Sequence, residues 1–221
     1  VDNSDQPNSR WYSGCGIYRH VWLTKTMKKA YIPQWGQYVS TTPQGDVKVK
    51  VDFLAQGSNM KLSIRNTIYD AKGKVVAKSL GNEVQQLKVK NPQLWDIGKG
   101  YLYTVKSELV VNGKVVDTAT TTTGFRDVKF DAQKGFFLNG RNIKINGVCE
   151  HHDFGCLGAA VNEDAMHRKL TILRDMGVNA IRSSHNPPAP ELLNMCDSMG
   201  LLVMDESFDM WRRKKSNGDY A

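Results

Sequence analysis

The sequence has no long apolar segment. No apolar run approaches the roughly 20 residues needed to span a bilayer, so no membrane-spanning helix is predicted. The first residues, VDNSDQPNSRW, also lack the charged and then apolar pattern of a secretory leader. Because a targeting segment can be missing from a sequence, the localisation stays open between periplasmic or secreted and cytoplasmic.

Cysteine is scarce, with four residues in a chain of 221. These cysteines are far apart and match no zinc-ligand spacing: Cys15, Cys149, Cys156 and Cys196. Unpaired thiols are therefore predicted, and a single disulfide is an alternative that the spacing does not favour.

Acidic residues are fewer than basic ones, 22 against 30, which gives a formal net charge of +8. A basic chain can indicate nucleic-acid binding. Here the lysines alternate along strand-like segments, as at Lys48 and Lys50, which is typical of solvated sheet faces. The dense basic run is confined to residues 212–215. Since net charge alone concerns solubility and loose association, no nucleic-acid partner and no membrane partner is predicted.

Short β-strands dominate the middle of the chain, from about residue 26 to residue 124. Strand-like composition or alternation is found in VKVKVDFLA, KLSIRNTIYD, KVVAKSL, EVQQLKVK, YLYTVKSELVV and KVVDTATTTT. Turns are expected at Ala71-Lys72-Gly73 and at Asn112-Gly113, the latter a strong hairpin signal. Leu94-Trp95 predicts a loop with a buried aromatic anchor. Six or seven strands in this length favour an immunoglobulin-like sandwich, interpreted as a structural spacer.

The first 25 residues form a segment too short to build a hydrophobic core by itself. Its residues 17–23 alternate like a strand behind the Gly14-x-Gly16 turn. We interpret it as the last strand of a domain whose beginning is missing.

After residue 124 the pattern changes to alternating strands and helices. A hairpin is expected at Asn139-Gly140, and Ile143 to Glu206 reads as β-α-β-α-β with short connections, which implies parallel strands. The first helix has Asn162 as N-cap and Gly177 as its stop. One apolar face of this helix is expected to contain Met166, Leu170, Leu173 and Met176. Three parallel strands leave an open edge, which favours a partial chain.

Polar residues follow each of these strands, and the stretch Asn179 to Glu206 holds most of them. Arg182 and His185 end one strand, and Asp205 and Glu206 end the next. A ligand-facing role is preferred over a purely structural ion pair, because this edge collects ligand chemistry in parallel β/α folds. Either carboxylate of the pair could face the site while the other anchors loops.

The first strand is followed by Glu150, His151, His152 and Asp153. Adjacent side chains on an extended chain point to opposite sides, so at most one of the two histidines serves a given site. A polar ligand rim is favoured over a metal site, and His167 is expected to face solvent.

Several motifs in order along the chain resemble glycoside hydrolase family 2, and most of all its β-galactosidases. The longest run comprises Asn179-Ala180-Ile181-Arg182-x-Ser184-His185-x-Pro187, Cys196-Asp197-x-x-Gly200-Leu201 and Val203-x-Asp205-Glu206. Shorter matches are Ser13-Gly14-x-Gly16-Ile17-Tyr18-Arg19, Leu94-Trp95, Tyr101-Leu102-Tyr103, Asn139-Gly140 and Gly147-Val148-x-x-His151.

The resemblance implies a multidomain β plus α/β protein. Residues 1–25 would be the C-terminal tail of a jelly-roll sugar-binding domain, and residues 26–124 an immunoglobulin-like β-sandwich. Residues 125–221 would be the start of a truncated catalytic domain, with the first three strands and two helices of an incomplete (β/α)8 TIM barrel.

The resemblance also implies the site residues. His151 and His185 would hydrogen-bond the sugar in the innermost subsite, and Arg182 would hold the catalytic carboxylates. Arg10 or Trp11 would close the pocket from the jelly roll. The supporting residues would be Asp205, Glu206 and Glu150, with Glu206 orienting its neighbours. His185 is followed by Asn186 where tyrosine is commoner in the family, so the loop there is expected to differ.

No catalytic residue is expected within this chain, because the family's acid/base and nucleophile glutamates belong to later barrel strands, beyond Ala221. Some members bind magnesium through Glu-x-His after the third strand, where this chain has Met210-Trp211-Arg212. No cofactor is therefore predicted, and magnesium or sodium stays an option for the larger enzyme only.

The expected parent enzyme is a glycosidase that hydrolyses terminal β-D-galactosides with retention, and this fragment is expected to be inactive. The alternatives are a relative acting on β-glucuronides or β-mannosides, or a non-catalytic carbohydrate-binding or scaffold fragment. The expected partner is the carbohydrate substrate. Linkage preference and oligomeric state, with a homo-oligomer as one option, stay open.

Overall fold

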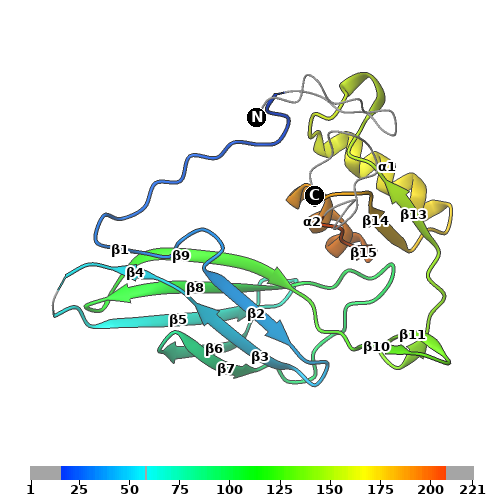
Figure 1. The fold of residues 1–221 in the computed structure, drawn as a ribbon. Coiled ribbons are helices and arrows are strands. Elements are labelled where there is room, and N and C mark those ends of the chain that lie inside the picture. Colours follow the sequence, from blue (N-terminus) through cyan, green and yellow to red (C-terminus); the bar gives the residue numbers. More distant parts are fainter. Residues whose placement is uncertain (1–15, 58, 208–221) are drawn as a thin grey trace. The chain divides into compact units, whose positions relative to one another are not determined.

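The computed structural model describes residues 16–57 and 59–207, which form two compact units. The sandwich unit spans Leu23–Lys144. The parallel-sheet unit takes its described residues from Val1–Trp22 and Ile145–Ala221. The elements of both units are labelled along the chain in Figure 1. No helix among the described residues has the length and apolar character needed to cross a membrane.

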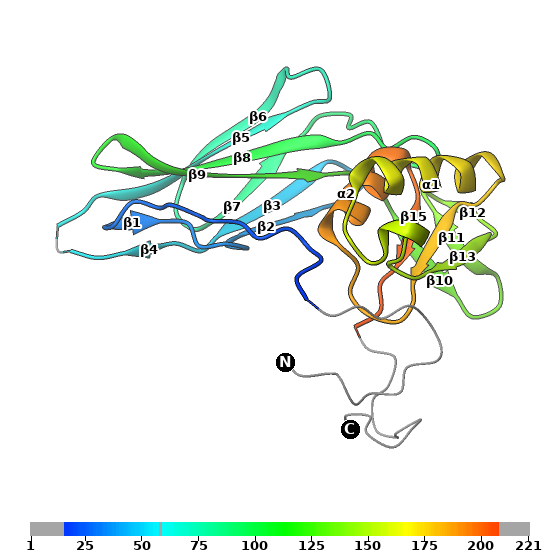
Figure 2. The same cartoon turned by 90° about the horizontal axis from the view of Figure 1, so that it is seen from above.

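The sandwich unit consists of antiparallel sheets. One sheet has the order β2-β3-β7 and another the order β6-β5-β8-β9. Their strands are β2 Gln37–Thr41, β3 Asp46–Val51, β5 Leu62–Tyr69, β6 Val75–Gly81, β7 Val84–Lys88, β8 Tyr103–Val111 and β9 Lys114–Thr123. The short strands β1 (Ala30–Tyr31) and β4 (Leu54–Ala55) pair with each other, as Figure 2 shows. All six predicted strand segments are confirmed, whereas β1 and β2 are absent from the prediction.

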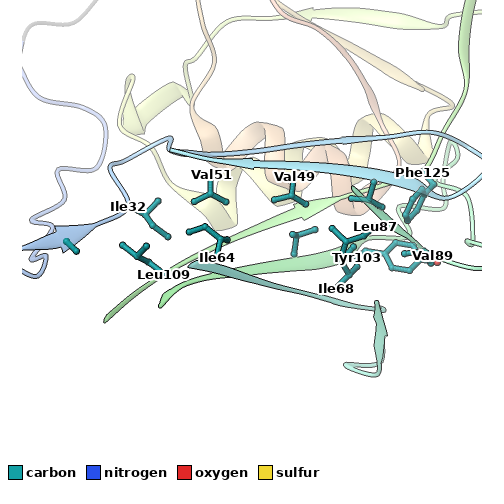
Figure 3. Close-up of a cluster of buried hydrophobic side chains, with 13 residues drawn as sticks. Ile32, Val49, Val51, Ile64, Ile68, Leu87, Val89, Tyr103, Leu109 and Phe125 are labelled. Atoms are coloured by element: carbon teal, nitrogen blue, oxygen red, sulfur yellow. The ribbon is translucent and has the colours of Figure 1, made fainter. Parts of the chain in front are cut away.

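The core of the sandwich unit is built from the apolar faces of its strands, and in β3 buried and exposed positions alternate strictly. In β3, Val47, Val49 and Val51 are fully buried, while Lys48 and Lys50 are exposed. Figure 3 shows the apolar side chains of β3 and β7 facing those of β5 and β8. The predicted solvated lysine face of this sheet is therefore confirmed.

The Asn-Gly pairs make the predicted hairpins. Asn112 and Gly113 have φ values of 50° and 82°, and Asn139 and Gly140 have values of 51° and 77°. Two consecutive positive φ angles are what a type I′ hairpin turn requires, and asparagine and glycine tolerate them best. The first pair joins β8 to β9. The second joins β11 (Gly135–Leu138) to β12 (Arg141–Asn142), and β10 (Val128–Asp131) completes that small sheet.

Trp95 is the buried aromatic anchor that the sequence predicts, with 2% of its surface exposed. Its backbone N–H donates to the carbonyl of Phe125 at 2.8 Å. Its own carbonyl accepts from Nδ2 of Asn139 at 3.0 Å. Trp95 therefore ties the loop before β8 to the segment that leaves β9 and to the β11–β12 turn.

The parallel-sheet unit has the predicted β-α-β-α-β order. Its elements are β13 Gly147–Glu150, the 3-10 helix η1 Gly155–Leu157, α1 Glu163–Asp175, β14 Ala180–Ser183, α2 Pro190–Met199 and β15 Leu202–Met204. The strands pair in the order β13-β14-β15, and both pairings are parallel, as predicted. The first strand begins at Gly147 rather than at Ile143, since residues 143–146 are irregular.

The two helices pack on this sheet through residues that include Met166, Leu170, Ile181 and Cys196. Asn162 caps α1, because its side-chain oxygen accepts from the N–H of Ala165 at 2.9 Å. The prediction that Met176 shares the buried face is wrong: it is 74% exposed. Its position explains this, since α1 ends at Asp175 and Met176 is already the C-cap residue.

Residues 17–23 form no strand, which corrects the expectation from their alternation. A β-strand needs the backbone hydrogen bonds of a neighbouring strand. Within the described ranges, strands that pair with a neighbour are found only from Ala30 onward. Alternation in an unpaired segment therefore produces an extended chain and not a sheet.

Gly45 offers a test of the sandwich unit. A Cβ atom added there would lie 2.1 Å from the carbonyl oxygen of Val89, and its φ is +93°. At Gly73, with φ +78°, the added atom would meet nothing within 4 Å. We expect Gly45→Ala to lower the free energy of unfolding by about 3 kcal/mol and Gly73→Ala by about 1 kcal/mol. Urea unfolding measures both, and equal losses would contradict the predicted steric conflict.

Candidate functional site

Polar side chains gather where β13, β14 and β15 end, at one edge of the parallel sheet. The residues at or directly after these ends are Glu150, His151, Ser184, His185, Asp205 and Glu206. Across the strands, Cys149, Arg182 and Met204 are register neighbours, so their side chains leave the sheet on the same face. This edge is where ligands bind in parallel β/α folds.

Arg182 is the centre of the cluster. Its Nε donates to Oε1 of Glu206 at 2.5 Å. Nδ1 of His185 lies 2.9 Å from Oε2 of the same carboxylate and 3.4 Å from Nη2 of Arg182. A carboxylate at this distance accepts a hydrogen bond from Nδ1–H, which leaves Nε2 as the acceptor of the neutral ring. Arg182, His185 and Glu206 thus form one cluster at the strand ends.

The same contacts keep Glu206 ionised. Burial by itself raises the pKa of Glu206, but hydrogen bonds from His185 and Arg182 and the positive charge of Arg182 outweigh it, so the pKa lies below its ordinary value of 4.5. In turn, hydrogen bonds with Cys149 and Glu206 raise the pKa of Arg182. The pair is therefore a guanidinium and a carboxylate at neutral pH.

Ser183 joins two of the strand ends, a role that sequence reasoning missed. The side chain is 4% exposed, and its Oγ accepts from the N–H of Glu206 at 2.9 Å. The same Oγ lies 3.3 Å from Oδ1 of Asp205 and donates to it. Of the two carboxylates, Glu206 contacts Arg182, and Asp205 contacts Ser183 at the end of β14.

His151 and His152 contact different parts of the unit, as the alternation of an extended chain predicts. The ring of His151 meets the ring of His185 edge to face, with centroids 5.7 Å apart. The ring of His152 instead stacks on Tyr18 at 5.6 Å. Burial, and then the charge of Arg19, lower the pKa of His152. Only His151 therefore joins the Arg182 cluster.

Glu150 is engaged away from that cluster. Its Oε2 accepts from Nζ of Lys169 on α1 at 2.6 Å. The same ammonium donates to the carbonyl of Asp153 at 3.2 Å and lies 4.5 Å from the ring centre of Phe154. Glu150 therefore links the end of β13 to α1. His167, on the same helix, is exposed as predicted.

Cys149 is a second contact of Arg182 that the sequence did not reveal. Nη1 of Arg182 lies 3.4 Å from its Sγ, and the residue is exposed. Hydrogen bonds with Ser184 and then Arg182 lower the pKa of this thiol. Cys149, Cys156 and Cys196 are unpaired, as predicted, and Cys15 lies outside the described residues. Within the described ranges no group of three or more His, Cys, Asp or Glu residues is placed to hold a metal ion.

A cavity of about 40 Å³ lies behind the strand ends, within the parallel-sheet unit. Its lining includes Glu150, His152, Ser183, Asn186, Tyr18 and Arg19, with apolar side chains from α1 and α2. A space of this size holds a few water molecules. Arg10, Trp11 and the segment Met210-Trp211-Arg212 lie outside the described residues.

Two family models match the chain in tandem. One, described as glycosyl hydrolases family 2, covers residues 30–126, and the other, described as the TIM barrel domain of glycosyl hydrolases family 2, covers residues 128–212. Among curated proteins, a β-galactosidase of Bacteroides ovatus, BoGH2A, is 54% identical over all of this chain and 28% of its own length. A putative β-glucuronidase of Formosa agariphila is 39% identical over all of this chain and 22% of its own length.

Solved structures give the same picture. A glycosyl hydrolase family 2 member from Bacteroides cellulosilyticus has a TM-score of 0.87 and 39% identity, over 96% of this chain and 29% of that one. A β-glycosidase from Bacteroides vulgatus has a TM-score of 0.86 and 33% identity, over 93% and 27%. The chain thus spans about a quarter of the length of the relatives that it matches.

The Glu206 contacts predict how stability depends on pH. Since the folded pKa of Glu206 lies below 4.5, its contribution is present above pH 4.5 and is lost as the pH falls through the lowered value. We expect Glu206→Gln to lower the free energy of unfolding at pH 7 and the difference from the unchanged protein to shrink below pH 4.5.

Urea unfolding across this pH range measures the effect. Asp175→Asn is the matched control, because Asp175 is an exposed carboxylate of α1 whose ion pair is with the adjacent Arg174. A difference for Glu206→Gln that is the same at about pH 3 and pH 7 would contradict the assignment.

Proposed function

The chain belongs to glycoside hydrolase family 2, and from this we propose that it forms part of an enzyme that hydrolyses terminal β-D-galactosides with retention of configuration. The observation that carries the proposal is the 54% identity, over the whole chain, to a protein named β-galactosidase. Because the chain spans 28% of that relative, the activity belongs to the larger protein in this proposal.

The proposed organisation has three parts. Residues 1–25 are the tail of a jelly-roll sugar-binding domain, residues 26–124 an immunoglobulin-like sandwich, and residues 125–221 the first strands of the (β/α)8 catalytic barrel. The two-sheet sandwich and the three parallel strands support the second and third parts. The two family models, which meet between residues 126 and 128, support a division near that point.

In this enzyme His151 and His185 bind hydroxyl groups of the terminal sugar. Their rings contact each other at the strand ends, so one small polar ligand can meet both. Because Glu206 binds Nδ1 of His185, the ring is fixed in one tautomer before the sugar arrives. Such preorganisation lowers the cost of binding a specific hydroxyl pattern.

Retaining hydrolysis uses two carboxyl groups about 5–5.5 Å apart, one as nucleophile and the other as acid and base. Glu206 is not the proton donor, because its lowered pKa keeps it ionised near neutral pH. Glu150 is held by Lys169. Membership of family 2 implies that both catalytic carboxylates lie on later strands of the barrel, where the charge of Arg182 would help keep the nucleophile ionised. The 221-residue chain alone would not turn over substrate.

A β-glucuronidase is the second candidate. Several relatives carry that name, among them the Formosa protein at 39% identity. A uronate differs from a galactoside by a carboxylate at C6, and such a group requires a cationic or hydrogen-bonding partner. The substrates must therefore be compared directly.

The test is a substrate panel on the full-length protein that contains this chain. We expect kcat/KM for p-nitrophenyl β-galactoside to exceed that for the matching glucuronide by about 10²-fold or more, since an unmatched carboxylate is costly to bury. The anomeric product observed first by NMR should be the β form. Preference for the glucuronide, or an inverted product, would reject the galactosidase proposal.

His185→Ala in the same full-length protein tests the recognition role. We expect kcat/KM to fall by about 10- to 100-fold, because one hydrogen bond to a sugar hydroxyl is lost. His167→Ala removes an exposed imidazole from α1 and should leave kcat/KM unchanged. Equal effects of the two substitutions would contradict a sugar contact by His185.

A further inference from the structure

The N-terminal part of the parallel-sheet unit binds the loop that follows β14. The three residues Tyr18, Arg19 and His20, called the clasp, make these contacts. Arg19 donates from Nη2 to the carbonyl of Pro187 at 2.6 Å and from Nη1 to the carbonyl of Pro188 at 3.3 Å. One guanidinium therefore holds two consecutive carbonyl groups.

The loop that Arg19 contacts is rich in proline. This segment contains three prolines, which have no backbone N–H and so donate no backbone hydrogen bonds: Pro187, Pro188 and Pro190. Arg19 supplies donors to two of its carbonyls. A guanidinium suits them, because it is planar, permanently charged and carries several N–H groups in a fixed geometry.

The other two clasp residues bind on either side of Arg19. Nδ1 of His20 lies 2.7 Å from Oε1 of Glu191 in the first turn of α2. The carbonyl of Tyr18 accepts from the N–H of Val161 at 3.0 Å, and its ring stacks on His152. The clasp thus joins the loop after β13, the loop after β14 and the start of α2.

The position of the held carbonyls links the clasp to the Arg182 cluster. Pro187 is two residues beyond His185, whose Nδ1 must stay 2.9 Å from Glu206. A loop that moves at Pro187 and Pro188 carries His185 with it. We propose that Arg19 is a positioning residue for His185: by holding these two carbonyls it sets the distance between the imidazole and Glu206. The sugar-binding consequence rests on the proposed function, whereas the positioning itself does not.

The experiment compares Arg19→Ala and Arg19→Lys in the 221-residue protein, with Arg174→Ala as the control. Arg174 lies on α1 in the same unit and pairs with the adjacent Asp175. Nitrogen-15 NMR of the labelled histidine rings reports the tautomer of His185. Amide hydrogen exchange of His185, Asn186 and Ala189 reports the order of the loop.

In Arg19→Ala we expect the Nδ1 and Nε2 signals of His185 to move toward one averaged position and these amides to exchange about tenfold faster or more. Arg19→Lys, which retains the charge and one set of donors, should give an intermediate result. Arg174→Ala should match the unchanged protein. His185 signals and amide exchange that stay unchanged in Arg19→Ala would overturn the proposal.

If Arg19→Ala does not fold, Arg19→Lys tests the proposal instead. An unchanged His185 spectrum in Arg19→Lys then overturns it. The readouts need no catalysis, so they separate this proposal from the proposed function. A full-length enzyme that fails on galactosides while Arg19→Ala still alters His185 would reject only the galactosidase assignment.

Discussion

Arg182 brings a permanent positive charge to the end of a parallel strand, and the groups around it are arranged by that charge. Its guanidinium contacts a carboxylate after β15, a thiol on β13 and an imidazole after β14. Each of these partners comes from a different strand of the parallel sheet or from the residues that follow it. One side chain therefore contacts groups from all three strands of the sheet or their ends.

Local signals in the sequence predicted most of the fold. The alternating valines of β3 and the Asn-Gly turns of two hairpins are properties of neighbouring residues, and each appears as expected. The strand β2 was missed because its residues, QYVST, show no sharp contrast between apolar and polar positions. In the structure none of them is fully buried. Residues 17–23 misled in the opposite sense, since their alternation lacks a pairing strand.

The site was less predictable because its contacts join residues far apart in sequence. The spacing showed that Asp205 and Glu206 would diverge, but not which would meet Arg182, because either orientation satisfies the pattern. Ser183 decides the matter by accepting from the N–H of Glu206, and no local rule marks a serine for that role. Cys149 reaches Arg182 only through strand pairing. In these cases the register of the parallel sheet determines which residues meet, and local sequence patterns do not specify that register.

The opposite orientations of His151 and His152 connect the strand-end cluster to the N-terminal segment. One dipeptide touches both the imidazole of His185 and the ring of Tyr18. A replacement of Tyr18 can therefore shift His151 through this dipeptide without altering His151 or His185 themselves. Tyr18 lies one side chain away from the peptide that carries His151. A substitution at Tyr18 can thus alter the arrangement at the strand ends from a position far away in the sequence.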